Sequence, residues 1–155
     1  MPDWIEWCRF LSIYCAGICA GGWVLVLVAI APAKRRFPPG PAVQLHQVTS
    51  EMIDRYLPVC TGIAILTGIL ILSLHATATT ASTISTAVAV AALLIAAVVS
   101  LVWNIRTNRK IAQWSTDDVP ADYREIQQRW DNTHAIRTLC GLVALAGYIL
   151  AVLAR

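Results

Sequence analysis

The side chains of this sequence that could transfer protons, donate hydrogen bonds to an anion or bind a metal gather in three short stretches. They are His46, Glu51, Asp54 and Tyr56 in the first, Asn104 and Asn108 in the second, and Tyr123, Trp130, His134 and Arg137 in the third. Histidine titrates near neutral pH and therefore suits proton transfer. Imidazole and carboxylate groups are also ligands of iron and copper.

The third stretch has helical spacing. Its four candidate residues are three, four or seven positions apart, which places them on one face of a helix. One interpretation is structural: Trp130 marks a membrane interface, Arg137 extends to lipid phosphates, and His134 is a polar residue near a helix start. The other interpretation is a functional site on that face.

A metal site is one chemical alternative. His46, Glu51 and His134 are candidate ligands for a mononuclear iron or copper ion. A di-iron carboxylate site in a bundle needs two Glu-x-x-His motifs and two further glutamates. The chain has three glutamates and no such motif, so a di-iron site is not expected. The sequence by itself identifies no cofactor.

Long uncharged intervals determine the fold class. The chain has 155 residues, 57% of them hydrophobic and only 14% charged. Asp, Glu, Lys and Arg are absent from residues 10–33, 56–105 and 138–154. Because a bilayer core needs about 20 apolar residues per helix, we predict an all-α integral membrane four-helix bundle in one domain, residues 1–155. Its spans are expected at about 10–33, 56–75, 84–104 and 137–154, which excludes a soluble enzyme and a nucleic-acid partner.

Basic residues predict the orientation in the inner or plasma membrane. Ten of the twelve lie between spans one and two or between spans three and four, and only Arg9 and Arg155 lie elsewhere. The positive-inside bias then places both long loops in the cytoplasm, against membrane lipids, and both termini outside. The acidic residues Asp3 and Glu6 precede the first span, so we expect it to be retained and not cleaved as a signal peptide.

Two helices are expected to extend beyond the bilayer. Asn104, Asn108 and Ile111 continue the helical pattern of span three, and an unbroken pattern runs from Ala121 into span four. A helix of about 33 residues is roughly 50 Å long, whereas the hydrocarbon core is about 30 Å thick. Helices three and four should therefore project together on the cytoplasmic side.

Small residues predict close helix contacts. Gly17 and Gly21 form a small-xxx-small stripe in span one, and span three is rich in alanine. Such surfaces let helices approach closely. We expect them to pack inside the bundle, with homo-oligomerisation as the alternative.

The polar motifs of the C-terminal half resemble those of one known family. They are Trp103-Asn104-x-x-x-Asn108-Arg109-x-Ile111-Ala112-x-Trp114, then Val119-Pro120-Ala121-Asp122-Tyr123, then Arg129-Trp130-x-x-x-His134-x-x-Arg137-Thr138. This arrangement resembles the anthrone-oxygenase-like family of small four-helix membrane proteins. The resemblance covers about 60 residues closely. The N-terminal half agrees in layout only, and Tyr123 stands where the family more often has tryptophan.

The resemblance implies a monooxygenase that uses dioxygen on a lipophilic aromatic substrate of anthrone or quinol type. His134 would be the general base, and Asn104, Asn108 and Arg137 would donate hydrogen bonds to the developing phenolate. Trp130 and Tyr123 would stack on the ring system. Glu51 or Asp54 would orient His134 or pair with Arg137.

The alternative from another class is a non-catalytic membrane subunit, or a membrane protein that binds a small molecule or lipid. An enzyme should have a pocket that is lined by His134, Arg137 and Asn104 and opens to the bilayer or the cytoplasm. A scaffold should have these groups satisfied by one another, with no cavity.

Overall fold

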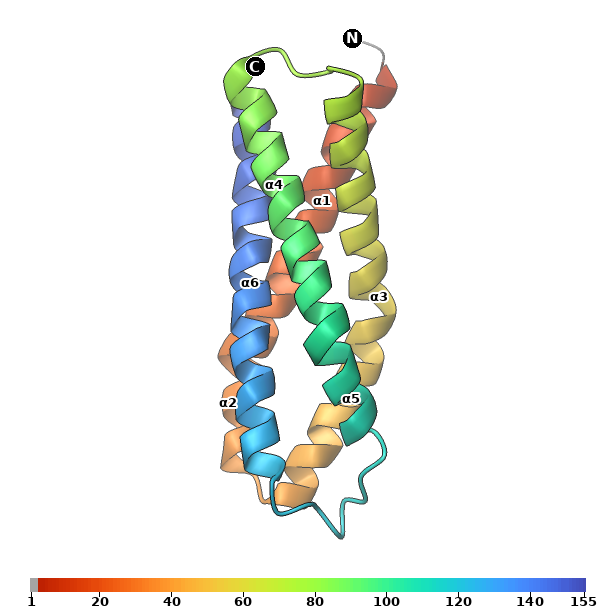
Figure 1. Cartoon of the computed structure of the whole chain (residues 1–155), viewed down its shortest axis with the longest axis vertical. Coiled ribbons are helices and arrows are strands. Elements are labelled where there is room, and N and C mark those ends of the chain that lie inside the picture. The colour runs from red at the N-terminus through yellow and green to blue at the C-terminus, as the bar shows by residue number, and fades with distance from the viewer. Residues whose placement is uncertain (1–2) are drawn as a thin grey trace.

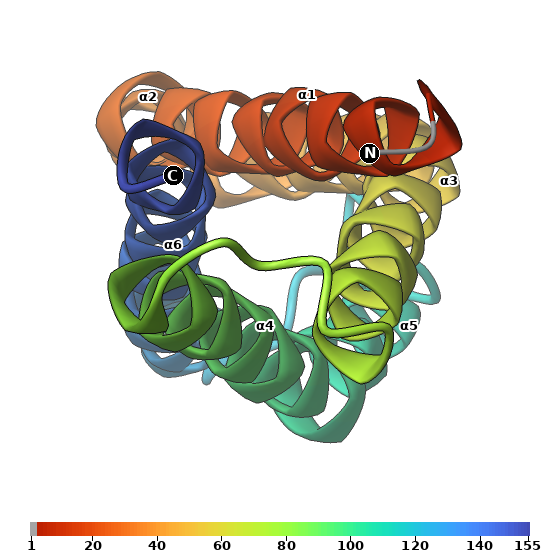
Figure 2. The ribbon, with the colours of Figure 1, turned by 90° about the horizontal axis from the view of Figure 1, so that it is seen from above.

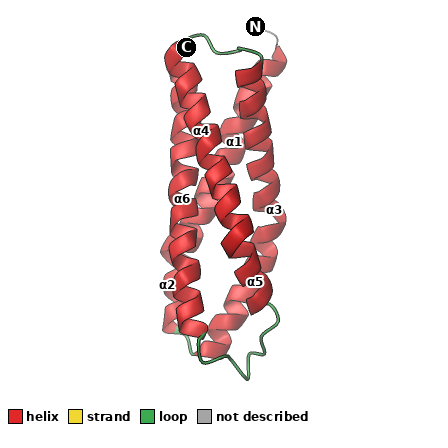
Figure 3. Ribbon diagram, viewed as in Figure 1, coloured by secondary structure: helices red, strands yellow, loops and turns green. Residues whose placement is uncertain are grey.

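A computed structural model describes residues 3–155 and contains four long helical rods (Figure 1). No strand occurs in this range, as the colouring of Figure 3 also makes clear. The first rod comprises α1 (Asp3–Leu25), the π-helical segment η1 (Val26–Ile30) and α2 (Ala31–Arg36); the second is α3 (Pro39–Ser73). The third comprises α4 (Thr80–Val99), the π-helical segment η2 (Ser100–Asn104) and α5 (Ile105–Ile111); the fourth is α6 (Tyr123–Leu153).

Local sequence determines where the rods begin. Pro39 lies in the first turn of α3, where the missing amide hydrogen of proline has no consequence. Thr79 caps α4 by accepting a hydrogen bond from the backbone N–H of Ser82 at 3.1 Å. The long loop expected between spans one and two is short in the structure. Only Phe37 and Pro38 separate α2 from α3.

The four rods form a ring in which α1 contacts α3 and α6, and α4 contacts the same two helices (Figure 2). Both termini and the α3–α4 connection lie at one end, here called the terminal end (Figure 1). The α2–α3 and α5–α6 connections lie at the opposite end, here called the loop end. The all-α class with four apolar spanning helices is confirmed, and this composition is compatible with an integral membrane protein.

Small residues bring the rods close together. A Cβ atom added to Gly147 on α6 would lie 2.9 Å from the carbonyl oxygen of Ser85 and 3.0 Å from the Cβ of Ala89 on α4. Gly17 on α1 faces Leu145 of α6 in the same chain, whereas Gly21 is exposed with open space around it. The alanine-rich third span therefore packs inside the bundle, and homo-oligomerisation stays a prediction.

Candidate functional site

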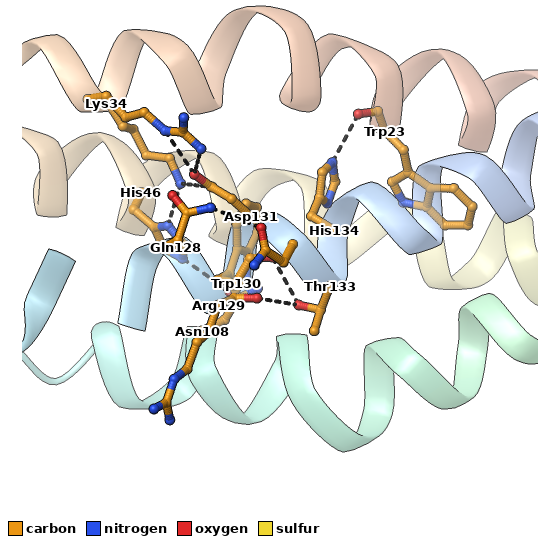
Figure 4. Close-up of polar contacts among 12 residues, drawn as sticks. Trp23, Lys34, His46, Asn108, Gln128, Arg129, Trp130, Asp131, Thr133 and His134 are labelled. Carbon is orange, nitrogen blue, oxygen red and sulfur yellow. Dashed lines mark hydrogen bonds and ion pairs between the residues drawn. The ribbon is translucent and has the colours of Figure 1, made fainter. Parts of the chain in front are cut away.

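Polar side chains from every rod are buried together in the loop half of the bundle (Figure 4). Buried residues of this polar cluster are Lys34, His46, Asn104, Asn108, Gln127, Trp130, Asp131, His134 and Arg137. Burying such groups is expensive unless each finds a partner. Their hydrogen bonds therefore define what the cluster can do.

His46 lies between a cation and an amide. The Lys34 Nζ is 2.9 Å from His46 Nδ1, and His46 Nε2 is 3.1 Å from the Asn108 Oδ1. An ammonium group can only donate, so Nδ1 accepts, and Nε2–H donates to the amide oxygen of Asn108. His46 is therefore a neutral imidazole.

His134 is held in the same way at the centre of the bundle. Arg137 Nη2 is 2.6 Å from His134 Nδ1, and His134 Nε2 is 2.9 Å from the carbonyl oxygen of Trp23. Figure 4 shows the imidazole directed at that carbonyl. Because a guanidinium can only donate, His134 is the neutral tautomer that carries its proton on Nε2. Both of its nitrogens are bonded, and its side chain is fully buried.

Trp130 joins the two histidines. Its ring stacks on His134 with centroids 4.9 Å apart and meets the edge of His46 at 4.8 Å. Its Nε1 donates to Asn108 Oδ1 at 2.7 Å, and the Lys34 ammonium lies 4.3 Å from its ring centroid. Trp130 is thus a packed member of the cluster, with only 5% of its surface exposed.

Two charged residues of the cluster were missed by sequence reasoning. Lys34 is buried 3.9 Å from an oxygen of Asp131, which also bonds the exposed Arg35 at 2.8 Å. In the sequence, Lys34 is one of the basic residues between spans one and two, and nothing in its spacing distinguishes it from Arg35 and Arg36. Asp131 lies three positions before His134, and this helical spacing was the signal that could have found it.

An apolar cavity of about 230 Å³ lies beside the cluster, between α3 and the rod of α4 and η2. Its lining residues are Trp23, Ile53, Asp54, Leu57, Pro58, Thr61, Gly62, Ile65, Ala97, Ser100, Leu101, Ile105 and Arg137. Arg137 is its only cation and Asp54 its only carboxylate. Arg137 donates to the Ser100 hydroxyl at 3.3 Å, lies 5.3 Å from the Trp23 ring, and has a buried Nε–H without a partner in residues 3–155.

Two further spaces share the lining residue Asp54 with the apolar cavity. A cavity of about 20 Å³, enough for one water molecule, reaches from Asp54 and Arg137 to Lys34 and His46. An open polar cleft between α3 and α5 is bordered by Asp54 and Asn108. The Asn108 Nδ2 donates to Asp54 Oδ2 at 2.7 Å. Asp54 thus borders the apolar cavity, the small cavity and the cleft.

Other candidate residues lie apart from these spaces. Glu51 is exposed and borders only the polar cleft among the three. Tyr123 is buried against Trp114, with ring centroids 6.0 Å apart, in a separate cluster at the loop end. Asn104 lies in η2, fully buried, and neither amide atom has a partner in the described part of the chain.

Of the three residues expected to line a catalytic pocket, Arg137 borders the apolar cavity, and His134 and Asn104 do not. The suggested metal ligands His46, Glu51 and His134 are also not brought together. No group of three His, Cys, Asp or Glu residues within residues 3–155 could hold a metal ion. The cause is geometric, since Glu51 is exposed and both nitrogens of each histidine are bonded to other groups.

Comparison with known proteins identifies the family. The anthrone oxygenase family matches residues 51–147, more than half of the chain. The chain belongs to the anthrone oxygenase family. No curated protein and no solved structure matches it significantly. The resemblance in the C-terminal half is thereby confirmed and extends back into α3.

The family match does not cover the whole site. It contains Asp54 and Asn108, as well as the face of α6 that carries Trp130, His134 and Arg137. The first rod and the start of α3 lie outside it. Lys34 and His46 come from these segments, as does the Trp23 carbonyl that holds His134. The anthrone oxygenase region is therefore completed by residues that precede it.

Proposed function

We propose that the protein is a membrane-embedded oxygenase that converts an activated CH₂ of a lipophilic fused-ring phenol or anthrone into a carbonyl with dioxygen. Membership of the anthrone oxygenase family supports this at the level of reaction class. The observation that carries the proposal is the apolar cavity that ends at one cation, Arg137, and one carboxylate, Asp54.

The cavity suits a flat apolar substrate. Small-molecule sites are mostly apolar with a few convergent polar groups, and typically measure roughly 300–1,000 Å³. At about 230 Å³ the cavity is slightly smaller, which favours a ring system of a few fused rings. Ile65 and Leu101 line it and belong to the apolar parts of α3 and η2. Such a substrate would arrive dissolved in the bilayer.

Arg137 matches the charge that the reaction develops. Removing a proton from the CH₂ leaves an electron pair that the ring system delocalises onto its oxygen. A preorganised donor near that oxygen lowers the barrier, because the charge appears only as the reaction proceeds. Arg137 borders the cavity and has an Nε–H without a partner in residues 3–155. We assign it the binding of this oxyanion.

His134 fits a positioning role for Arg137. To act as the base, His134 would have to release either the Arg137 guanidinium or the Trp23 carbonyl. With both hydrogen bonds in place, His134 Nδ1 accepts a hydrogen bond from Arg137 and fixes the direction of the guanidinium. Trp130 stacks on His134 and maintains this orientation.

The overall reaction balances with dioxygen as the only oxidant. The CH₂ carbon gains one oxygen atom as the carbonyl, its two hydrogens leave, and the second oxygen atom becomes water. Four electrons pass from substrate to dioxygen. No further electron acceptor or donor is required.

The test is oxidation of anthrone by the purified protein in lipid nanodiscs. We expect consumption of one O₂ per quinone formed, and one ¹⁸O atom in the quinone when ¹⁸O₂ is used. Arg137→Met should lower kcat by about 100-fold or more because an oxyanion donor is lost. Arg106→Met, which removes an exposed arginine of α5, is the matched control. Binding of anthrones without any oxidation would contradict the proposal and support the small-molecule-binding alternative, which the saturated hydrogen bonds of His134 favour.

A further inference from the structure

Asp54 borders three separate spaces, and this position suggests where the proton goes. We propose that Asp54, and not His134, takes the protons from the substrate carbon, and that the water formed leaves through the polar cleft between α3 and α5. This inference rests on the proposed oxygenase function. It assigns a catalytic role to a residue expected from the sequence only to orient His134 or pair with Arg137.

Position is the first reason. Asp54 is the only carboxylate on the wall of the apolar cavity, and no histidine borders that cavity. Arg137 also lines this cavity. A proton acceptor and an oxyanion donor thus face one substrate space. Carboxylates remove protons from carbon acids effectively when donors stabilise the resulting oxyanion.

A chain of hydrogen bonds fixes Asp54 and leaves one of its oxygens free. Lys34 donates to His46, His46 donates to Asn108, and Asn108 donates to Asp54. The Asn108 oxygen accepts from both His46 and Trp130, so its NH₂ group must face Asp54. This series of hydrogen bonds occupies Oδ2 of Asp54. Oδ1 makes no hydrogen bond to any residue in 3–155 and is available to a substrate C–H.

Access to water is the second reason. Asp54 is only partly buried and borders the polar cleft, which is also lined by Gln47, Glu51 and Arg109. His134 is fully buried and has no such contact. A group that gains and loses protons in each turnover must exchange them with substrate or water. Asp54 borders both the apolar cavity and the polar cleft, and His134 borders neither.

The proton steps balance around Asp54. Its carboxylate first accepts a C–H proton, and the electron pair of that bond passes into the ring system. Dioxygen adds at the carbon, and protonated Asp54 gives its proton to the distal oxygen, which yields a hydroperoxide. Asp54 then removes the second C–H proton; the O–O bond breaks as the carbonyl forms, and the departing hydroxide takes that proton to become water. Asp54 is then again an unprotonated carboxylate.

Hydrogen exchange tests the proton step separately from oxidation. Anthrone is incubated with the protein in nanodiscs, without oxygen and in D₂O, and deuterium entering its CH₂ group is followed by NMR. We expect the native protein to accelerate exchange, and Asp54→Asn to slow it by about 100-fold, in the range lost with a general base. Asp118→Asn removes an exposed carboxylate of the α5–α6 connection and is the matched control.

Further variants separate loss of the base from loss of the site. Asp54→Asn should bind the quinone product, measured by quenching of the intrinsic tryptophan fluorescence, within about 3-fold of the native protein. Asp54→Glu keeps a carboxylate and should recover part of the exchange. His134→Gln should lower oxidation through Arg137 while leaving more exchange than Asp54→Asn does.

The outcomes are distinct. Exchange that survives in Asp54→Asn but is abolished in His134→Gln overturns the inference and restores His134 as the base. A native protein that catalyses exchange but no oxidation contradicts the oxygenase function, while its dependence on Asp54 still supports the proton role. A native protein that catalyses neither contradicts both.

Discussion

At the scale of residues, cations determine the protonation state of the two buried histidines. Lys34 donates to His46 and Arg137 donates to His134, always at Nδ1. Each imidazole must then carry its proton on Nε2 and donate it onward. The histidines work as neutral connectors, and the charged groups beside them hold the polar network in one arrangement.

Lys34 and Asp131 form the ion pair on which this arrangement depends. Their closest charged atoms are 3.9 Å apart, and both side chains are almost fully buried, whereas Arg35, the other partner of Asp131, is about half exposed. Asp131→Asn should therefore destabilise the protein by about 3 kcal/mol, because it leaves the Lys34 charge buried without a counter-charge. Arg35→Gln should cost about 1 kcal/mol or less. Unfolding in mixed micelles measures both.

The double variant Lys34→Met with Asp131→Asn provides the control. Removing both charges abolishes the uncompensated ion, so part of the stability lost in Asp131→Asn should return. Equal losses for Asp131→Asn and Arg35→Gln would show that the buried pair contributes nothing beyond a surface ion pair.

At the scale of elements, α3 and α4 separate enough to leave the apolar cavity, and Gly62 lies on its wall. A Cβ atom added at Gly62 would meet nothing within 4 Å. Gly62→Leu should therefore fold normally and fill part of the cavity. We expect KM for anthrone to rise at least about 10-fold, the effect of roughly 1.4 kcal/mol, with quinone binding weakened equally.

Gly21→Leu is the matched variant. Gly21 also has open space around it, and it does not border the cavity. It should leave KM unchanged. If both leucine variants raise KM alike, the substrate does not occupy the space between α3 and α4.

The two π-helical segments each shift the buried face of their rod by about one residue. Along the first rod the buried positions pass from Val26 to Ala31 and then Lys34, a step of five residues across η1. An ordinary α-helical period takes steps of three or four, so the step from Val26 to Ala31 is one residue longer than this period allows. Across η2 the buried face likewise passes from Val99 to Asn104.

Helical spacing predicts part of the site on α6, but it was not used to find Asp131, which lies on the same continuous helix. The shared face of Trp130, His134 and Arg137 was predicted, and all three are buried together on α6. Asn104 and Asn108 were also expected on one helix face; Asn104 is the last residue of η2, and Asn108 lies in α5. The neighbours of these residues could not be predicted, since the step in η1 and the pairing of rods arise from tertiary packing.

At the scale of the whole molecule, the four rods, their order and the clustering of site residues at one end follow from the spacing of uncharged intervals and basic residues. The apolar cavity does not, because it depends on how far α3 stands from α4. Nearly all basic residues lie in the loop half, together with the polar cluster and the cleft that Asp54 borders. The orientation of the protein in the membrane therefore also determines on which side of the membrane the polar cluster and the cleft lie.

The positive-inside bias predicts that the loop end faces the cytoplasm. Ser115 is exposed in the α5–α6 connection, and Ala78 is exposed in the α3–α4 connection at the opposite end. In a Cys8→Ala background, Ala78→Cys should react with a membrane-impermeant maleimide in intact cells. Ser115→Cys should react only after the membrane is permeabilised. Because the cleft lies in the loop half, this result would place the water released through the cleft in the cytoplasm. The reverse labelling pattern would place the polar cluster and the cleft on the outer side of the membrane and contradict the predicted orientation.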